Sequence, residues 1–358
     1  MIAATHTHNG PVVVDYLHPF ATYGLVDLAG IQAYSSWLED TVVDLVRTAL
    51  LADRTPVTLD YTVATETFAY NRRGLSYVET AVPVMVARSA QGDPRAVVFG
   101  YAAHPTAGGL RSQFDPDYPG GACAEIEAAY PGCIGLFLLG AAGDQGPLGI
   151  TGLDSADALG ARLGATVLEA VARRGRPVDG PVRTQLTEIP LPLEISTDAT
   201  TLANFRNAFV ERLKNLEGQP AYYQRHAEIM IARIDTGNIS TTVPFLARLW
   251  TFGGADPLRL LFTSGELVSG YAVYFRARHG GAERLWVGGY ADELPCYIPS
   301  NEFFPPTMPN GSYEGGWAAD FPAVAAGSMA AYGWAAHFRY GAGGVEQAVI
   351  AGIGSLLA

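Results

Sequence analysis

Histidine and carboxylate side chains interrupt several apolar segments of the sequence, and these residue types bind metal ions. His6 and His8 lie two residues apart in THTHNGP, so an extended backbone would project both to the same face. His104 ends the apolar run GYAAHPT, where Pro105 cannot continue a strand ladder. Glu266 follows LLFTSG, where a strand is expected to turn into a helix and free backbone amides suit a negative charge. Two histidines and a carboxylate at separate strand ends fit a catalytic zinc site, which keeps one position for water.

Spacing alone does not separate this chemistry from simpler roles, because a hydrogen-bonded structural role suits each histidine taken singly. Asp144, in GAAGDQGP, is predicted to brace its glycine-rich loop rather than to bind metal. Cys123, Cys133 and Cys296 show no Cys-x-x-Cys spacing. They are predicted to be buried small apolar residues rather than disulfides or thiolate ligands of zinc.

The elements that would position these residues alternate between helix and strand. Helices are predicted at 31–53, at 158–175, as a pair within 199–235, from near Gly265, over 321–340 and after residue 342. Strands are predicted at 57–64, 82–88, 96–103, 133–140, 257–262 and 284–290. This order predicts an α/β or α+β fold in which mixed β-sheets are layered with α-helices. Since no linker rich in Pro, Gly or Ser divides the chain, we expect one catalytic domain over residues 1–358.

Composition excludes several classes of partner. The chain has 358 residues, of which 49% are hydrophobic and 16% charged, enough apolar material for a globular core. Its net charge of -12 and its lack of basic runs argue against binding to nucleic acid or to anionic membranes. No transmembrane segment is expected, because no apolar stretch reaches the roughly 20 residues that a membrane span needs. MIAATHTH has no basic start and no apolar core, so it does not read as a signal peptide.

A series of short motifs carries a resemblance to a known family. In chain order they are THTHNGP (5–11), NRR (71–73), HPT (104–106), DYPG (117–120), FLLGAAGDQGP (137–147), GE (265–266), YIPS (297–300) and YEGG (313–316). From residue 5 to about 340, the sequence resembles the catalytic domain of the neutral/alkaline non-lysosomal ceramidases. The resemblance implies a zinc-dependent amidase that cleaves the N-acyl bond of a ceramide-like lipid to a fatty acid and a long-chain amine such as sphingosine.

The same resemblance implies a role for each matching residue. It assigns four ligands to one Zn²⁺ per chain, namely His6, His104, Glu266 and Tyr297. It assigns His8 to proton transfer, and Arg72 and Tyr313 to the carbonyl oxygen and polar head group of the substrate. Without it, Arg72 in YNRRGL would be a solvated turn cation, and Tyr313 an aromatic residue at the edge of the core.

The sequence also departs from the family. Met1 falls about where the last of several upstream strands would run, so we expect an N-terminally truncated domain. The immunoglobulin-like C-terminal domain of larger ceramidases is not expected either. Gly146 stands where relatives carry Ser or Asn before the proline, which favours a metal-bound water over a serine nucleophile. Asp292 replaces an Asn that is frequent in relatives.

Alternative functions remain open. The substrate can be another lipid or small-molecule N-acyl amide, and a non-catalytic relative would keep the fold without the metal. An amidohydrolase-type barrel also uses an N-terminal His-x-His, but it needs eight strand-helix units and further ligands late in the chain. His226 and His279, the histidines available there, are expected on charged helical surfaces. By resemblance, the protein is compatible with a secreted or periplasmic location, and its oligomeric state is not indicated.

Overall fold

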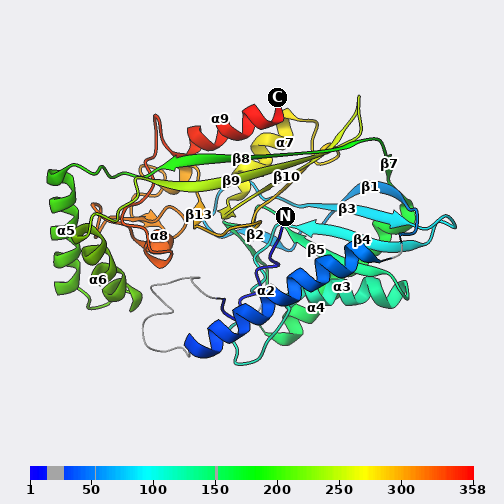
Figure 1. Cartoon of the computed structure of the whole chain (residues 1–358), viewed down its shortest axis with the longest axis horizontal. Coiled ribbons are helices and arrows are strands. Elements are labelled where there is room, and N and C mark those ends of the chain that lie inside the picture. The colour runs from blue at the N-terminus through cyan, green and yellow to red at the C-terminus, as the bar shows by residue number, and fades with distance from the viewer. Residues whose placement is uncertain (14–27, 53, 150–151) are drawn as a thin grey trace.

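The chain folds into layers of mixed β-sheet and α-helix (Figure 1). The structure is a computed structural model that describes residues 1–13, 28–52, 54–149 and 152–358. The predicted α/β class, with mixed sheets layered with helices, is confirmed.

The first sheet has five strands in the order β5-β4-β3-β1-β7. Its strands are β1 (Thr58–Thr65), β3 (Ala81–Arg88), β4 (Pro94–Tyr101), β5 (Ile134–Leu139) and β7 (Arg176–Val178). The β4–β5 pair is parallel and the other pairs are antiparallel. Strands were predicted in all of these places except β7, because their alternating or continuous apolar pattern is local.

The second sheet has four strands in the order β12-β10-β9-β8. Its strands are β8 (Val182–Pro192), β9 (Thr242–Phe252), β10 (Leu258–Thr263) and β12 (Leu285–Gly288). Only the β10–β12 pair is parallel. Three short ladders lie outside the two sheets: β2 (Ala69–Asn71) with β6 (Gln145–Pro147), β11 (Glu266–Leu267) with β13 (Tyr297–Ile298), and β14 (Gly311–Ser312) with β15 (Trp317–Ala318).

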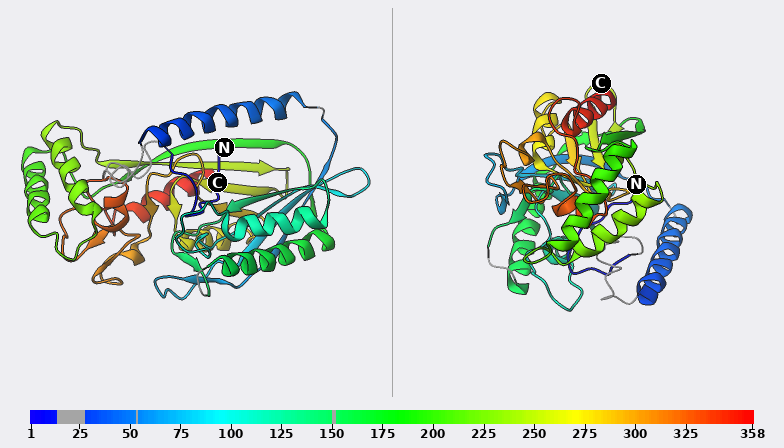
Figure 2. Two further views of the ribbon diagram at one scale, coloured as in Figure 1. Left: turned by 90° about the horizontal axis from the view of Figure 1, so that it is seen from below. Right: turned by 90° about the vertical axis from the view of Figure 1, so that its left-hand side faces the viewer.

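The helices lie outside the sheets. They are α2 (Leu28–Leu51), α3 (Asp117–Ala129), α4 (Leu153–Arg173), α5 (Ala199–Lys214), α6 (Tyr222–Asp235), α7 (Ser269–Arg278), α8 (Gly327–Ala331) and α9 (Val345–Leu357), with a 3₁₀ turn η1 at Asn301–Phe303. Figure 2 shows α2 along the outside of the layers and α5 and α6 together at one end. Among the described residues of α2, only Ser35 is buried. None of the helices in the described part of the chain is both long and apolar enough to cross a membrane.

Three buried clusters join the layers. On the outer face of the first sheet, alternate residues of β3 such as Val84 pack with α3 and α4. The inner faces of the two sheets meet through residues that include Met85 and Trp286. On the far side of the second sheet, β9 packs against α7 and α9. Each sheet therefore packs on both faces, and the order of layers is helix, sheet, sheet, helix. β3 is accordingly buried almost without interruption, whereas burial along β9 alternates from residue to residue.

Most predicted helices are present, with shifted ends. Residues 31–51 of the helix predicted at 31–53 belong to α2, and residue 53 lies outside the described residues. The pair predicted within 199–235 is α5 and α6, and α5 begins after Asp198, whose carboxylate accepts a hydrogen bond from the Thr201 amide at 2.9 Å. The helix expected near Gly265 begins at Ser269, after β11.

The helix predicted over 321–340 is wrong. Only α8 is helical there, because Gly327 and Gly333 adopt positive φ angles of 45° and 79° that interrupt a helix. A Cβ at Gly327 would also lie 2.8 Å from the Tyr313 carbonyl oxygen, so the chain has to bend where it meets that loop.

The expected surface position of His226 is also wrong. The side chain is fully buried, and its Nε2 lies 2.7 Å from the Trp334 carbonyl oxygen, to which it donates. Its Nδ1 therefore accepts from the buried guanidinium of Arg212, at 3.2 Å. The charged residues near it in the sequence, Arg225 and Glu228, are half-buried and exposed, respectively.

Candidate metal centre

Glu266 and Tyr297 meet through backbone pairing. They are direct partners in the parallel ladder of β11 and β13, so their side chains leave the same short sheet together. Gly265 has a positive φ of 72°, and a Cβ there would lie 2.8 Å from the Cys296 carbonyl oxygen. The glycine before the glutamate therefore permits the close approach of the two strands.

The segment that carries the two N-terminal histidines is anchored upstream of His6. The Ala4 amide donates to the Tyr290 carbonyl oxygen at 3.1 Å. Asp292 makes two hydrogen bonds with Ile2. Its backbone amide donates to the Ile2 carbonyl oxygen at 2.7 Å, and its Oδ1 accepts from the Ile2 amide at 3.0 Å.

A second anchor lies downstream of His8. The Asn9 side chain donates to the Gly109 carbonyl oxygen at 2.7 Å, and Asn9 forms an antiparallel bridge with Asp115. His6 itself has a φ of 63°, so the extended backbone expected for the pair is wrong. The rings of His6 and His8 are nevertheless in contact edge to face, with centroids 5.1 Å apart and an interplanar angle of 85°. Both histidines are thus held on two sides although they lie near residue 1.

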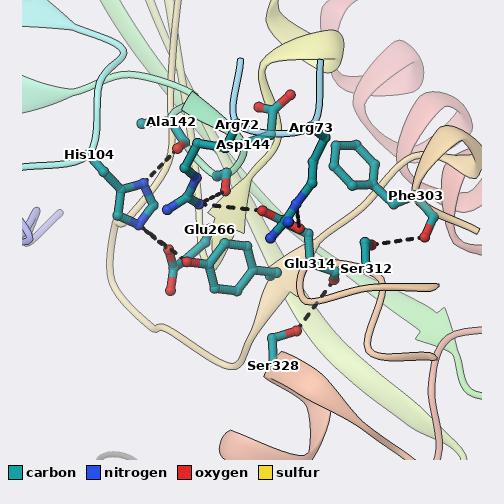
Figure 3. Close-up of polar contacts among 12 residues, drawn as sticks. Arg72, Arg73, His104, Ala142, Asp144, Glu266, Phe303, Ser312, Glu314 and Ser328 are labelled. Carbon is teal, nitrogen blue, oxygen red and sulfur yellow. Dashed lines mark hydrogen bonds and ion pairs between the residues drawn. The ribbon is translucent and has the colours of Figure 1, made fainter. Parts of the chain in front are cut away.

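His104 is fixed in one tautomer by its surroundings. Its Nδ1 lies 2.7 Å from the Ala142 carbonyl oxygen, which can only accept, so Nδ1 carries the proton (Figure 3). In the neutral ring, Nε2 then presents a lone pair. That nitrogen lies 3.0 Å from Glu266 Oε2 and 3.2 Å from the Tyr297 hydroxyl.

The spacing of these atoms fits zinc. His6 Nε2 is buried, lies 3.4 Å from Glu266 Oε2 and makes no hydrogen bond with the described residues. Zinc lies about 2.0–2.2 Å from nitrogen and oxygen ligands, which places neighbouring ligands of a tetrahedral site about 3.3–3.6 Å apart. The separations of 3.0 to 3.4 Å that link His6, His104, Glu266 and Tyr297 approach this spacing.

Electrostatics favours a cation at this point. Burial alone would raise the pKa of Glu266, but His6 and His104 hold it well below its usual value, so the carboxylate is ionised. Burial lowers the pKa of His104, so that ring is neutral at pH 7 despite the attraction of Glu266. With Nδ1 protonated, the neutral His104 ring presents its Nε2 lone pair to this carboxylate at 3.0 Å. A metal ion would stabilise this arrangement of acceptors.

Two tyrosines that the sequence did not single out contact the same carboxylate. The Tyr332 hydroxyl donates to Glu266 Oε1 at 2.6 Å. The Tyr290 hydroxyl lies 3.4 Å from Oε2, and its ring packs on His6 with centroids 4.6 Å apart. No local pattern marks either residue. Tyr332 in particular falls within the segment predicted as one long helix.

His8 lies at the solvent side of the cluster. Its side chain remains exposed, but the protein around the ring removes water, and this together with the charges of His6 and His104 lowers the pKa of His8 to about 4. The ring is therefore neutral at pH 7. Nitrogen atoms of His6, His8 and His104 lie within 4.8 Å of one another, so a three-histidine metal set is a geometric alternative in which His8 is a ligand.

Arg72 and Tyr313 lie beside this cluster. The Arg72 guanidinium donates to the Gly143 carbonyl oxygen and interacts electrostatically with the nearby Tyr297 hydroxyl. Its side chain is only 25% exposed, which differs from a solvated turn cation. Burial would lower the pKa of Arg72, but Tyr297 and Glu314 raise it, so the guanidinium stays charged. The Tyr313 ring is 39% exposed and lies 5.5 Å from the Tyr297 ring.

Asp144 braces the loops behind the site, in agreement with its predicted role. Its buried carboxylate accepts from the Ser269 amide at 2.6 Å and from the Asn71 side chain at 2.7 Å. Its carbonyl accepts from the Arg72 amide at 2.8 Å. The turn that carries Arg72 is thereby tied to the start of α7.

The fold is similar to that of solved ceramidases. The neutral ceramidase from Pseudomonas aeruginosa matches with a TM-score of 0.60 and 17% sequence identity, over 92% of this chain and 58% of that one. A ceramidase complexed with C2 matches with a TM-score of 0.58 and 17% identity, over 92% of this chain and 59% of that one. No family model and no curated protein sequence matches. The chain thus has the fold of neutral ceramidase, as the motifs predicted, and spans less than two thirds of the length of these proteins.

Proposed function

We propose that this protein is a zinc-dependent hydrolase that cleaves the N-acyl amide bond of ceramide or a ceramide-like lipid. One observation carries the proposal. In a chain with the neutral ceramidase fold, two histidine nitrogens, a carboxylate and a phenol converge at separations of 3.0 to 3.4 Å. Catalytic zinc sites are built from nitrogen and oxygen ligands of this kind with one position left open.

In this proposal His6, His104, Glu266 and Tyr297 hold the metal. When bound, zinc supplies a nucleophilic water that ionises near neutral pH and a Lewis acid for the amide carbonyl. The protein contributes a neutral His104 whose lone pair is oriented by Ala142, and a Glu266 that stays ionised because of its neighbours. Orientation by such partners is usual for ligands of catalytic metals.

The remaining side chains act on the substrate. Arg72 and Tyr313 donate to the carbonyl oxygen as it gains negative charge, which stabilises the transition state. His8 is neutral at pH 7, so it can accept a proton and return it to the departing amine. Expulsion of the amine requires that proton, because an unprotonated amide nitrogen is a poor leaving group.

The substrate class is proposed from the solved neighbours, both of which are ceramidases. Hydrolysis of another N-acyl amide at the same centre is the second candidate function. It is favoured by the low sequence identity of 17%, at which side chains that contact the lipid can differ while the fold persists.

The test combines metal content with activity. We expect the purified protein to bind one zinc per chain and, when loaded, to hydrolyse fluorescent N-acyl sphingosine. Removal of zinc by a chelator should abolish hydrolysis, and added zinc should restore it. Cleavage of short N-acyl amides alone would favour the second candidate function. A protein that binds no zinc and cleaves neither substrate would be a non-catalytic relative.

A further inference from the structure

Glu314 is a buried carboxylate to which no role has been assigned so far. It is fully buried, and it faces two arginines (Figure 3). Its Oε2 lies 2.6 Å from Arg73 Nε, and its Oε1 lies 3.5 Å from Arg72 Nη2. A buried charge is costly unless it is paired, so this carboxylate requires at least one of the two cations.

Arg72 connects this carboxylate to the metal centre. Its guanidinium faces Glu314 at 3.5 Å, and the same group donates to the Gly143 carbonyl oxygen and interacts electrostatically with the Tyr297 hydroxyl. A guanidinium is planar and rigid, so an anchor on one edge fixes the donors on the other edges. The position of Glu314 thus determines where the donors of Arg72 point.

The backbone around Glu314 is itself held. Ser328 donates from its amide to the Tyr313 carbonyl oxygen at 2.9 Å and from its hydroxyl to the Glu314 carbonyl oxygen at 3.4 Å. The Ser312 hydroxyl donates to the Phe303 carbonyl oxygen at 2.9 Å. The turn is therefore fixed to α8 and to η1, and Glu314 is a rigid anchor.

We propose that Glu314 is a positioning residue that holds the Arg72 guanidinium beside the metal centre. The proposal rests on the proposed function, in which Arg72 binds the substrate carbonyl. Glu314 does not contact any proposed zinc ligand by hydrogen bond or ion pair among the described residues, so its effect passes through Arg72. Arg73, at 34% exposure, can turn to water, whereas Arg72 is confined between Glu314, Gly143 and Tyr297.

The direct test is Glu314→Gln, which keeps the shape of the side chain and removes its charge. We expect zinc content equal to wild type, with kcat/KM on N-acyl sphingosine lower by up to about 100-fold, the usual consequence of a displaced positioning group. Arg73→Gln is the matched control. It breaks the shorter contact with the same carboxylate, and it should lower kcat/KM less than Glu314→Gln does.

A double-mutant cycle separates positioning from a general structural role. If Glu314 acts through Arg72, the double variant Arg72→Ala/Glu314→Gln should be no slower than Arg72→Ala. In addition, millimolar guanidinium should restore activity to Arg72→Ala but not to the double variant, because Glu314 is needed to hold the added cation. The proposal would be overturned if the losses in kcat/KM of the two single variants multiplied in the double variant, or if guanidinium restored the activity of both variants equally.

Two further measurements keep the test decisive. If Glu314→Gln does not fold, the charge-balanced variant Arg73→Gln/Glu314→Gln replaces it, with Arg73→Gln as its reference. Urea unfolding of the same cycle reports the coupling of Arg72 and Glu314 without any substrate, and no coupling would overturn the proposal. Coupling in a zinc-loaded wild-type protein that cleaves no amide would instead refute only the proposed function. Full activity of Glu314→Gln would show that Glu314 is only structural.

Discussion

Tyr332→Phe is a sharp test of the metal centre, because it removes one hydroxyl and leaves every proposed ligand in place. The hydroxyl donates to Glu266 Oε1 at 2.6 Å, while Oε2 of the same carboxylate faces His6 and His104. The carboxylate can rotate about its terminal bond. The contact with Tyr332 therefore selects the orientation in which Oε2 points into the cluster.

The size of the effect follows from two independent scales. A hydrogen bond to a charged group contributes about 1.5–3 kcal/mol. Loss of a group that orients a metal ligand typically weakens metal binding about 10- to 100-fold, which corresponds to about 1.4–2.7 kcal/mol. Since Glu266 is buried, water cannot easily replace the lost donor. We therefore expect Tyr332→Phe to raise the Kd for zinc about 10- to 100-fold.

The assay is competition for zinc with a chromophoric chelator at constant pH. Tyr290→Phe is the matched control, because it removes the same group from the opposite oxygen of the same carboxylate, where the contact is 3.4 Å long. It should change the Kd less, since a hydrogen bond of that length is weak. Unchanged zinc affinity in Tyr332→Phe, or a larger effect of Tyr290→Phe, would refute the geometry described for Glu266.

Three further predictions concern single histidine and carboxylate side chains. Alanine in place of His6, His104 or Glu266 should abolish both zinc binding and hydrolysis, because each change removes a ligand, and full zinc occupancy in His104→Ala would contradict the ligand set. His8→Ala should keep its zinc while turnover falls by about 100-fold or more, so zinc loss in this variant as well as in His6→Ala and His104→Ala would favour the three-histidine set. Burial and the charge of Arg212 lower the pKa of His226 to about 3. Below about pH 6.5 the unfolded chain therefore binds a proton at His226 that the folded chain does not bind, and the free energy of unfolding should decrease as the pH falls. Urea unfolding at several pH values should show a shallower decline in His226→Gln, and parallel curves would contradict the buried neutral ring.

The residues that could be predicted from sequence are those whose surroundings are local. His104 and Glu266 each follow an apolar strand, and the strand pattern extends over the preceding few residues. Tyr297 needed the motif resemblance, because its pairing with Glu266 joins segments 31 residues apart, from β11 to β13. The extended backbone predicted around His6 was wrong because two distant contacts determine the path of that segment. Ala4 donates to the Tyr290 carbonyl oxygen, and Asn9 pairs with Asp115.

The residues that were missed depend on distant contacts. Tyr332 reaches Glu266 across 66 positions of sequence, and Arg73 reaches Glu314 across 241. The alanine-rich composition of 321–340 favoured a helix, since alanine has the highest helix propensity. Gly327 and Gly333 override that propensity, and the bend they permit is what carries Tyr332 to the carboxylate.

The proposed metal centre is therefore assembled from segments that do not stabilise one another locally. The N-terminal segment supplies His6, the ladder of β11 and β13 supplies Glu266 and Tyr297, and the end of β4 leads to His104. The segment from 313 to 332 supplies no proposed ligand, but it contacts the centre at two points. The Glu314 carboxylate pairs with Arg72, and the Tyr332 hydroxyl donates to Glu266. Because each contribution exists only when its segment is docked, we expect zinc binding to be coupled to the order of all of them. We therefore expect affinity for the metal to depend on residues that do not bind it, and substitutions in the 313–332 segment to act on the proposed centre through the contacts of Glu314 and Tyr332.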